Sequence, residues 1–351
     1  MADKSRRLDW RSGGWLLLLM MVLVLAVVVW RVLPLLGKSS RAIGDGLNIE
    51  SYGFSLDDLN VPRDLIVAAG FPKDGMPALV DPGAMPGSGV VPLNESRRGK
   101  YIVTSDRVVG VVLGGEARAY PVRLLNWHEV INDTLGGIPI AVTYHPLCDS
   151  VVVFDRRVGD EVLEFGVSGL LFNSNQLLFD RRTDPAEESL WSQLLGRAVT
   201  GPAALAGRTL DVLPSSVARW DRWLALYPET TVIDPDPDLV KRYERNPYGN
   251  YYLTGQPRFP VEPLPPDGEE KLMQPMVFVE TADDSWMQAL TAESAATGEW
   301  SEPLPGVRFL AETDGVTTTF VVEAEPGTRV VHSLWFAWYA HHPGSAAPVT
   351  R

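Results

Sequence analysis

The chain has 351 residues, and 45% of them are hydrophobic, which is ample for a buried core. It carries 44 Asp and Glu residues against 31 Lys and Arg residues, and this net charge of -13 argues against nucleic acid as a partner. Because Cys148 is the single cysteine, the chain cannot build a disulfide framework of its own.

The N-terminal segment has the pattern of a membrane anchor. From Gly13 to Trp30 the residues form an apolar run without a charge, which is about the length that a helix needs to cross a bilayer. Basic residues precede the run, so the positive-inside rule places residues 1–12 in the cytoplasm. We predict a transmembrane anchor over residues 13–36 in the cytoplasmic membrane, with the main domain outside, periplasmic or extracellular. A cleaved secretion signal is the alternative, although its apolar core is usually shorter.

The rest of the chain is predicted to be rich in β-structure. Residues 37–97 are rich in Gly, Pro, Ser and Asp and indicate a stalk and wrapping segment, with one helix over Leu56–Ala69. Residues 98–233 are predicted as a first β-rich unit, because short β-branched runs alternate there with the turn sequences GGEA, TLGG and VGDE. A linker over 234–271 and a second, shortened β-rich unit over 272–347 follow. Helices within the first unit are expected at Val122–Asn132, Ser189–Leu195 and Val217–Leu226.

Two parts of the chain resemble each other. The stretch GIPIAVTYHPLCDSVVVFD, which begins at Gly137, aligns without a gap with GVRFLAETDGVTTTFVVEA, which begins at Gly306. The pair Trp220 and Trp223 recurs with the same spacing at residues 335 and 338. Blocks that recur in one order indicate an internal duplication. We therefore predict a mainly β or α+β fold of two related β-rich units behind the N-terminal helix.

The first unit holds the polar residues that could carry chemistry. His145 and Cys148 lie three residues apart on a turn that contains proline, and His128 lies one strand away. Two imidazoles and one thiolate suit copper or zinc. The sequence therefore predicts a metal site made by His128, His145 and Cys148. Asp133 and Asp149 are candidates for orienting the imidazoles.

Two other readings stay open. Cys148 could be the nucleophile of an enzyme, with His128 or His145 lowering its pKa, although a lone cysteine is often simply buried in a core. The third class is a non-catalytic module that binds a glycan or a protein, whose polar residues line a pocket or else only satisfy turns and helix ends. The residues of that possible pocket are Asn173, Ser174, Asn175, Asp180, Trp191 and Gln193.

Several motifs together resemble a known family. They include KDGMPAL, GGEARAYPVRLLNWHEVINDTLGG, VTYHPLC, FGVSGLLFNSN and WFAWYAHHP. From about Lys73 to Pro343 the chain is similar to domain of unknown function 3179, which occurs in bacterial and archaeal secreted or anchored proteins. That family usually carries T-Y-C-P-L-C in its second motif, and His145 stands here at the first of those two cysteines. Histidine can replace cysteine as a ligand of zinc or copper but not in a dithiol pair, so the replacement favours metal binding over thiol redox chemistry.

The sequence thus predicts a membrane-anchored extracytoplasmic protein that binds copper, preferred to zinc, through a His/His/Cys site. Its expected contacts are the membrane and partners in the cell envelope. The resemblance implies no activity, so the sequence leaves open whether the chain is an enzyme.

Overall fold

The computed structural model describes residues 42–96, 100–266, 268, 271–280, 287–291, 301–304, 306–313, 318–325 and 327–344, and in the N-terminal segment Trp15, 18–25 and Val27. The described residues of the N-terminal segment are helical, and their apolar side chains are exposed. Within these described ranges, no helix is at once long and apolar enough to cross a bilayer. Most of the predicted anchor, residues 13–36, lies outside the described residues, so the anchor stays a prediction.

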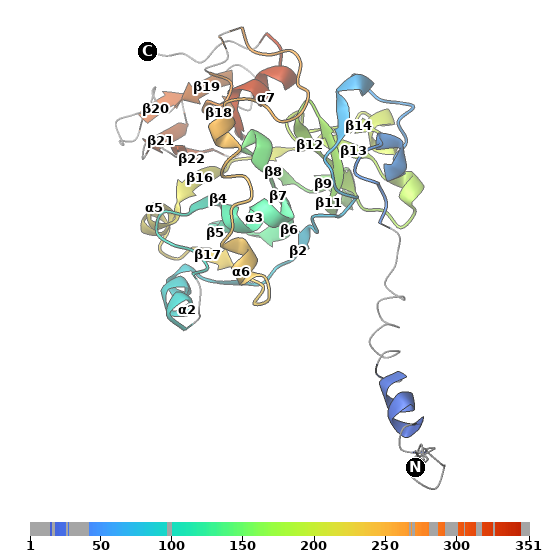
Figure 1. The fold of residues 1–351 in the computed structure, drawn as a ribbon. Coiled ribbons are helices and arrows are strands. Elements are labelled where there is room, and N and C mark those ends of the chain that lie inside the picture. Colours follow the sequence, from blue (N-terminus) through green and yellow to red (C-terminus); the bar gives the residue numbers. More distant parts are fainter. Residues whose placement is uncertain are drawn as a thin grey trace, which may run out of the picture. The chain divides into compact units, whose positions relative to one another are not determined.

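Ile43–Arg351 form one unit that is rich in β-structure, as the sequence predicts (Figure 1). In the first large sheet the strands follow the order β19-β18-β23-β8-β7-β6-β2, and β15 pairs with β8. The bounds of these strands are β2 (Leu79–Val80), β6 (Val130–Leu135), β7 (Ile138–His145), β8 (Ser150–Asp155), β15 (Val212–Leu213), β18 (Pro275–Glu280), β19 (Met287–Thr291) and β23 (Arg329–Leu334).

The second large sheet follows the order β20-β21-β22-β16-β4-β5-β17-β3. Most of its neighbouring strands are antiparallel, whereas β17 runs parallel to β5. The bounds of its strands are β3 (Ala84–Pro86), β4 (Arg107–Leu113), β5 (Glu116–Pro121), β16 (Ser216–Arg219), β17 (Thr231–Ile233), β20 (Ser301–Leu304), β21 (Val307–Thr313) and β22 (Thr318–Ala324).

The two large sheets share one strand order. In the first sheet β6, β7 and β8 are followed by β23, β18 and β19, and in the second β20, β21 and β22 are followed by β16, β4 and β5. The junctions also correspond, since Val151 of β8 pairs with His332 of β23 and Phe320 of β22 pairs with Val217 of β16. Strands from both predicted units therefore contribute to both sheets.

A smaller sheet has the order β1-β11-β12-β13-β14, and β9 and β10 form a separate hairpin. The segment predicted to wrap the domain supplies an edge strand to each of the three larger sheets, because β1, β2 and β3 each lie at the end of one strand order. The bounds are β1 (Ile66–Ala68), β9 (Arg157–Val158), β10 (Glu161–Val162), β11 (Phe165–Phe172), β12 (Asn175–Asp180), β13 (Leu190–Ser192) and β14 (Arg197–Thr200).

The helices of the described residues are short. The α-helices are α2 (Val90–Ser96), α3 (Val122–His128), α4 (Pro202–Leu205), α5 (Trp220–Leu226), α6 (Val240–Tyr243) and α7 (Trp335–His341). The 3-10 helices are η2 (Ile49–Tyr52), η3 (Arg63–Leu65), η4 (Gly87–Gly89), η5 (Pro146–Cys148), η6 (Pro185–Glu187) and η7 (Tyr252–Thr254). Helices α3 and α5 confirm two of the predicted helices in part, because each covers a portion of its predicted range.

Two predicted helices are wrong. Ser189–Leu195 contains strand β13, which pairs with β12 on one side and β14 on the other, so sheet pairing overrides the local pattern. Leu56–Ala69 contains η3 and β1. Pro62 lies inside that range, and proline lacks the backbone N–H that a continuing helix requires.

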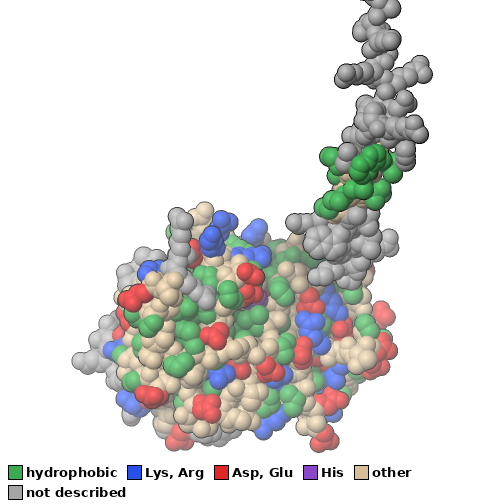
Figure 2. All heavy atoms as spheres, turned by 90° about the horizontal axis from the view of Figure 1, so that it is seen from below, with side chains coloured by type: hydrophobic (Ala, Val, Ile, Leu, Met, Phe, Trp, Pro, Cys, Tyr) green, Lys and Arg blue, Asp and Glu red, His purple; other side chains and the backbone are tan. Residues whose placement is uncertain are grey.

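The main core contains residues from both large sheets. Val109 of β4, Ile140 of β7 and Val153 of β8 are fully buried in it, together with Trp223 of α5. Gly110 lies under the Trp223 ring, and a Cβ atom at this position would come within 2.2 Å of the indole, so only glycine fits there. On the surface, acidic and basic side chains are interspersed (Figure 2).

Candidate functional site

The turn between β7 and β8 carries His145 and Cys148. His145 ends β7, and Pro146–Cys148 form the 3-10 turn η5, with proline at its first positions. Asp149 closes the turn in the left-handed region, at φ 42°. Because His145 pairs with Ser150 across the hairpin, the histidine and the cysteine sit at one end of these two strands.

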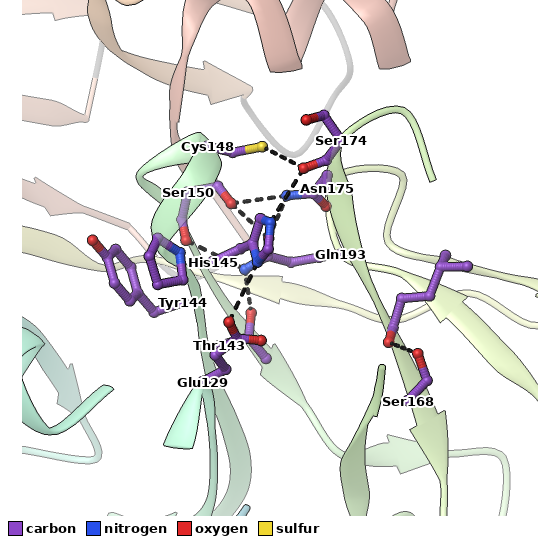
Figure 3. Close-up of polar contacts among 12 residues, drawn as sticks. Glu129, Thr143, Tyr144, His145, Cys148, Ser150, Ser168, Ser174, Asn175 and Gln193 are labelled. Carbon is purple, nitrogen blue, oxygen red and sulfur yellow. Dashed lines mark hydrogen bonds and ion pairs between the residues drawn. The ribbon is translucent and has the colours of Figure 1, made fainter. Parts of the chain in front are cut away.

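One backbone carbonyl holds both side chains. The Cys148 thiol donates to the Ser174 carbonyl at a Sγ–O distance of 3.2 Å, and His145 Nε2 lies 3.2 Å from the same oxygen (Figure 3). A carbonyl only accepts hydrogen bonds, so the Nε2 proton points at Ser174 in this arrangement. The structure therefore brings His145 and Cys148 together, as the sequence predicts.

Glu129 is the carboxylate next to this pair. Its Oε1 atom lies 3.6 Å from His145 Nδ1, and both side chains are buried. Glu129 follows helix α3 and has an unusual backbone, with φ 56° and ψ -30°. Glu129 is not among the site residues that the sequence predicts. Its position is the signal that could have identified it. Glu129 lies between helix α3 and strand β6, which are both largely buried, and a glutamate is rarely buried without a partner.

Backbone strain concentrates around Cys148. A non-glycine residue with positive φ is uncommon, and such residues cluster at functional sites. Among the described residues that adopt this conformation, four lie at the turns that carry the site and two lie elsewhere. The four are Glu129, Asp149, Asn173 and Ser174, and the other two are Asp74 and Asp81.

A buried network of neutral polar groups adjoins the pair. Gln193 Nε2 donates to Thr143 Oγ1 at 2.9 Å, and Ser150 Oγ donates to Gln193 Oε1 at 2.6 Å. Asn175 Nδ2 donates to Ser150 Oγ at 3.0 Å. These contacts orient Asn175, whose Nδ2 also donates to Gln193 Oε1 at 2.9 Å.

Several buried polar atoms at the site have no hydrogen-bond partner among the residues that the structure describes. They are His145 Nδ1, Ser174 Oγ and Asn175 Oδ1, together with both amide atoms of Gln176. A buried polar atom without a partner costs stability, so such atoms need an explanation. Donors and acceptors both occur in this set, and a polar ligand could satisfy them.

The Cys148 thiol is fully buried. Its burial is the largest cause that raises its pKa well above the usual range, and the negative charges of Asp149 and Glu129 raise it further, whereas the nearby Asn175 side chain lowers it. The thiol is therefore protonated at neutral pH in this arrangement. A reactive thiolate requires a change that admits substrate and brings Nε2 of His145 to the sulfur.

His128 does not join this pair. Its Nδ1 atom lies 2.7 Å from the Pro77 carbonyl, and its Nε2 atom lies 2.9 Å from the Tyr243 hydroxyl, so both ring nitrogens are occupied. Burial lowers the pKa of His128, which keeps the imidazole neutral. Across the described part of the chain, no group of three or more His, Cys, Asp or Glu side chains could hold a metal ion.

The two predicted orienting aspartates contact other groups. Asp133 accepts hydrogen bonds from Arg118 at 2.7 Å and from Tyr120 at 2.8 Å. Asp149 accepts two hydrogen bonds from Arg107, at 3.0 Å and 2.9 Å, so it fixes the turn that carries Cys148. Glu129, and neither aspartate, is therefore the carboxylate beside His145.

Five of the six residues predicted as a ligand pocket separate into two groups, and the sixth, Asn173, hydrogen-bonds the Glu262 backbone. Ser174, Asn175 and Gln193 belong to the surroundings of Cys148. Asp180 accepts a hydrogen bond from Ser189 N at 2.6 Å, which supports the structural interpretation of this residue. Trp191 is fully buried beside Phe165, and it borders a separate cavity of about 650 Å³ that Cys148 does not line.

The comparisons with known proteins give one match. The family model described as "Protein of unknown function (DUF3179)" matches residues 73–304, a range that includes the whole site. No curated protein and no solved structure matches the chain.

Proposed function

The chain belongs to the DUF3179 family, and from the geometry of its site we propose that it is an enzyme that uses Cys148 as a nucleophile. His145 is the proposed proton acceptor, and Glu129 is the proposed positioning residue. The shared contact of the Cys148 thiol and His145 Nε2 with the Ser174 carbonyl carries this proposal, because it holds thiol and imidazole next to each other.

The proposed step begins with a change of tautomer. The Glu129 carboxylate favours the imidazole form whose proton is on Nδ1, which leaves Nε2 free to take the thiol proton. With an acyl donor, the sulfur bonds to the carbonyl carbon and the bond to the leaving group breaks. The thiol proton passes through His145 to the leaving group, and water then hydrolyses the thioester. The neutral amides around Cys148 would bind the polar groups of the substrate.

Acylation of Cys148 tests this proposal. The full-length protein is treated with p-nitrophenyl acetate, and mass spectrometry of the digest measures acetylation of the Cys148 peptide. His145→Asn is expected to slow acetylation about 100-fold or more, because it removes the proton acceptor. Glu129→Gln is expected to slow it less and to shift its pH dependence, since a positioning residue acts through the imidazole.

His332→Gln is the matched control, because it removes another buried histidine, in strand β23, whose Nε2 atom contacts the Ser215 carbonyl and not the thiol. Its acetylation rate is expected to equal that of the unchanged protein. An equal rate in His145→Asn, or no acetyl group on Cys148, would refute the proposal. Metal analysis provides another check: stoichiometric copper or zinc that is lost in both Cys148→Ser and His145→Asn would favour a metal site instead.

Two features of the wider chain are also part of the proposal. The matching strand orders and junction registers of the two large sheets support an internal duplication in which only the first unit carries the nucleophile. The apolar sequence of residues 13–36 supports an N-terminal membrane anchor, with the site outside the cytoplasm.

A further inference from the structure

Two consecutive tyrosines bind the turn that precedes Cys148. The Tyr251 hydroxyl donates to the Leu147 carbonyl at 2.9 Å, and the Tyr252 hydroxyl donates to the Pro146 carbonyl at 2.6 Å. Their ring centroids lie 5.5 Å apart. These two hydroxyls therefore attach residues 246–256, which we term the cover segment, to the backbone next to the nucleophile.

The cover segment is bounded by two anchored residues. On one side Tyr243 contacts His128, with the hydroxyl oxygen 2.9 Å from Nε2. On the other side Glu262 N donates to Asn173 Oδ1 at 2.9 Å, and Asn173 Nδ2 donates to the Glu262 carbonyl at 2.9 Å. His128 and Asn173 were both predicted as site residues, and the structure gives them a role at the two sides of this segment.

Contacts within the cover segment hold its own shape. Tyr251 N donates to the Tyr248 carbonyl at 2.9 Å, and Tyr248 N donates to Asn246 Oδ1 at 2.9 Å. Leu253 points into solvent and is 84% exposed, so this apolar side chain does not fasten the segment to the domain. Gly255 has φ 68°, a conformation that glycine adopts at no steric cost. The segment thus keeps one shape between its anchors.

We infer that the cover segment is a lid over Cys148, which swings away when the Tyr251 hydroxyl releases the Leu147 carbonyl and the Tyr252 hydroxyl releases the Pro146 carbonyl. This inference rests on the proposed function, since a fully buried nucleophile needs access to its substrate. Lid movement also brings solvent or substrate to the unpartnered atoms of His145, Ser174 and Asn175. Loops that exclude water from a reacting centre and open for exchange are common in enzymes.

Because Cys148 is the single cysteine, the rate of its alkylation measures how often the lid opens. The full-length protein is treated with iodoacetamide under native conditions, and the rate of Cys148 alkylation is measured by mass spectrometry. Tyr251→Phe/Tyr252→Phe removes the two hydroxyls and keeps both rings. We expect alkylation to become about 25-fold faster, because each net hydrogen bond shifts the opening equilibrium by about fivefold.

Tyr101→Phe is the matched control. This variant also removes a buried hydroxyl, which donates to the Ile233 carbonyl at 2.7 Å. Tyr101, however, lies in the main core and not in the cover segment. Its alkylation rate is expected to match that of the unchanged protein. An equal acceleration in Tyr101→Phe, or none in the double variant, would overturn the lid. Hydrogen exchange of the unchanged protein gives a check without variants: amides of residues 246–256 are expected to exchange faster than those of β7 and β8.

A further variant separates the lid from the proposed chemistry. His145→Asn is added to Tyr251→Phe/Tyr252→Phe, and alkylation is measured again. A lower rate supports both the lid and the role of His145. If the tyrosine variant alkylates fast and His145→Asn leaves that rate unchanged, the lid stands and the proposed function fails.

Discussion

Arg107→Met is expected to lower the free energy of unfolding by about 3–5 kcal/mol, because it leaves the Asp149 carboxylate buried without its cation. Both side chains are largely enclosed, with 19% of Arg107 and 10% of Asp149 exposed. The two hydrogen bonds from Arg107 hold both carboxylate oxygens. The Tyr144 hydroxyl, which donates to Asp149 at 3.0 Å, cannot compensate for the lost charge. Urea denaturation of the full-length protein measures the loss.

Arg107→Met/Asp149→Asn is the matched control for this prediction. It removes both charges, and asparagine tolerates the left-handed backbone of residue 149. Most of the lost stability should return, because replacing both members of a buried pair is far less costly than removing one. If the single variant is as stable as the unchanged protein, or the double variant is no better than the single one, Arg107 does not stabilise the turn through Asp149.

The strands and tight turns could be predicted from local sequence. Gly114 and Gly115 connect β4 to β5, and Gly136 and Gly137 connect β6 to β7, where the sequence predicts hairpins. All four glycines have positive φ, which the turn requires. Such turns depend on a few neighbouring residues, so the sequence is sufficient. Strand β13 depends instead on partners before and after it in the chain, and its predicted helix is wrong.

In the candidate site too, some contacts follow from local sequence and others depend on the folded backbone. His145 and Cys148 share one short turn, so their proximity follows from local spacing. His128 and Glu129 are adjacent in sequence, but their side chains take different partners, Tyr243 and His145. The positive φ at Glu129 is set by the junction of α3 and β6, and the sequence does not reveal it. The sequence therefore predicts His128, and not Glu129, as the neighbour of His145, because residue types alone do not reveal this backbone conformation.

The cover segment could not be predicted from the spacing of its residues. Its NPYGNYY sequence indicates turns, and the composition around it predicts a linker over residues 234–271. Tyr251 and Tyr252 bind backbone carbonyls more than a hundred residues away in the chain. A backbone carbonyl leaves no mark in the sequence, so such contacts appear only in the folded structure.

Acidification from pH 7.5 to pH 5 is expected to lower the free energy of unfolding through His332 and His341. Burial lowers the pKa of His332 to about 4 and that of His341 to about 3. In the unfolded chain both imidazoles titrate near the ordinary value of about 6.5. Below that value the unfolded state binds more protons than the folded state, so stability falls as pH decreases from about 6.5 towards 4.

Each of these two histidines should account for about 2 kcal/mol at pH 5. Because burial also lowers the pKa of His342 to about 4, each contribution is measured as the difference between the unchanged protein and a histidine variant in urea denaturation at both pH values. His332→Gln and His341→Asn are the matched variants, because each amide can replace the ring nitrogen that contacts the Ser215 or Ala337 carbonyl. Combining them should make stability less dependent on pH in this window, since neither amide titrates. A double variant that loses as much stability at pH 5 as the unchanged protein would show that other groups cause the acid sensitivity.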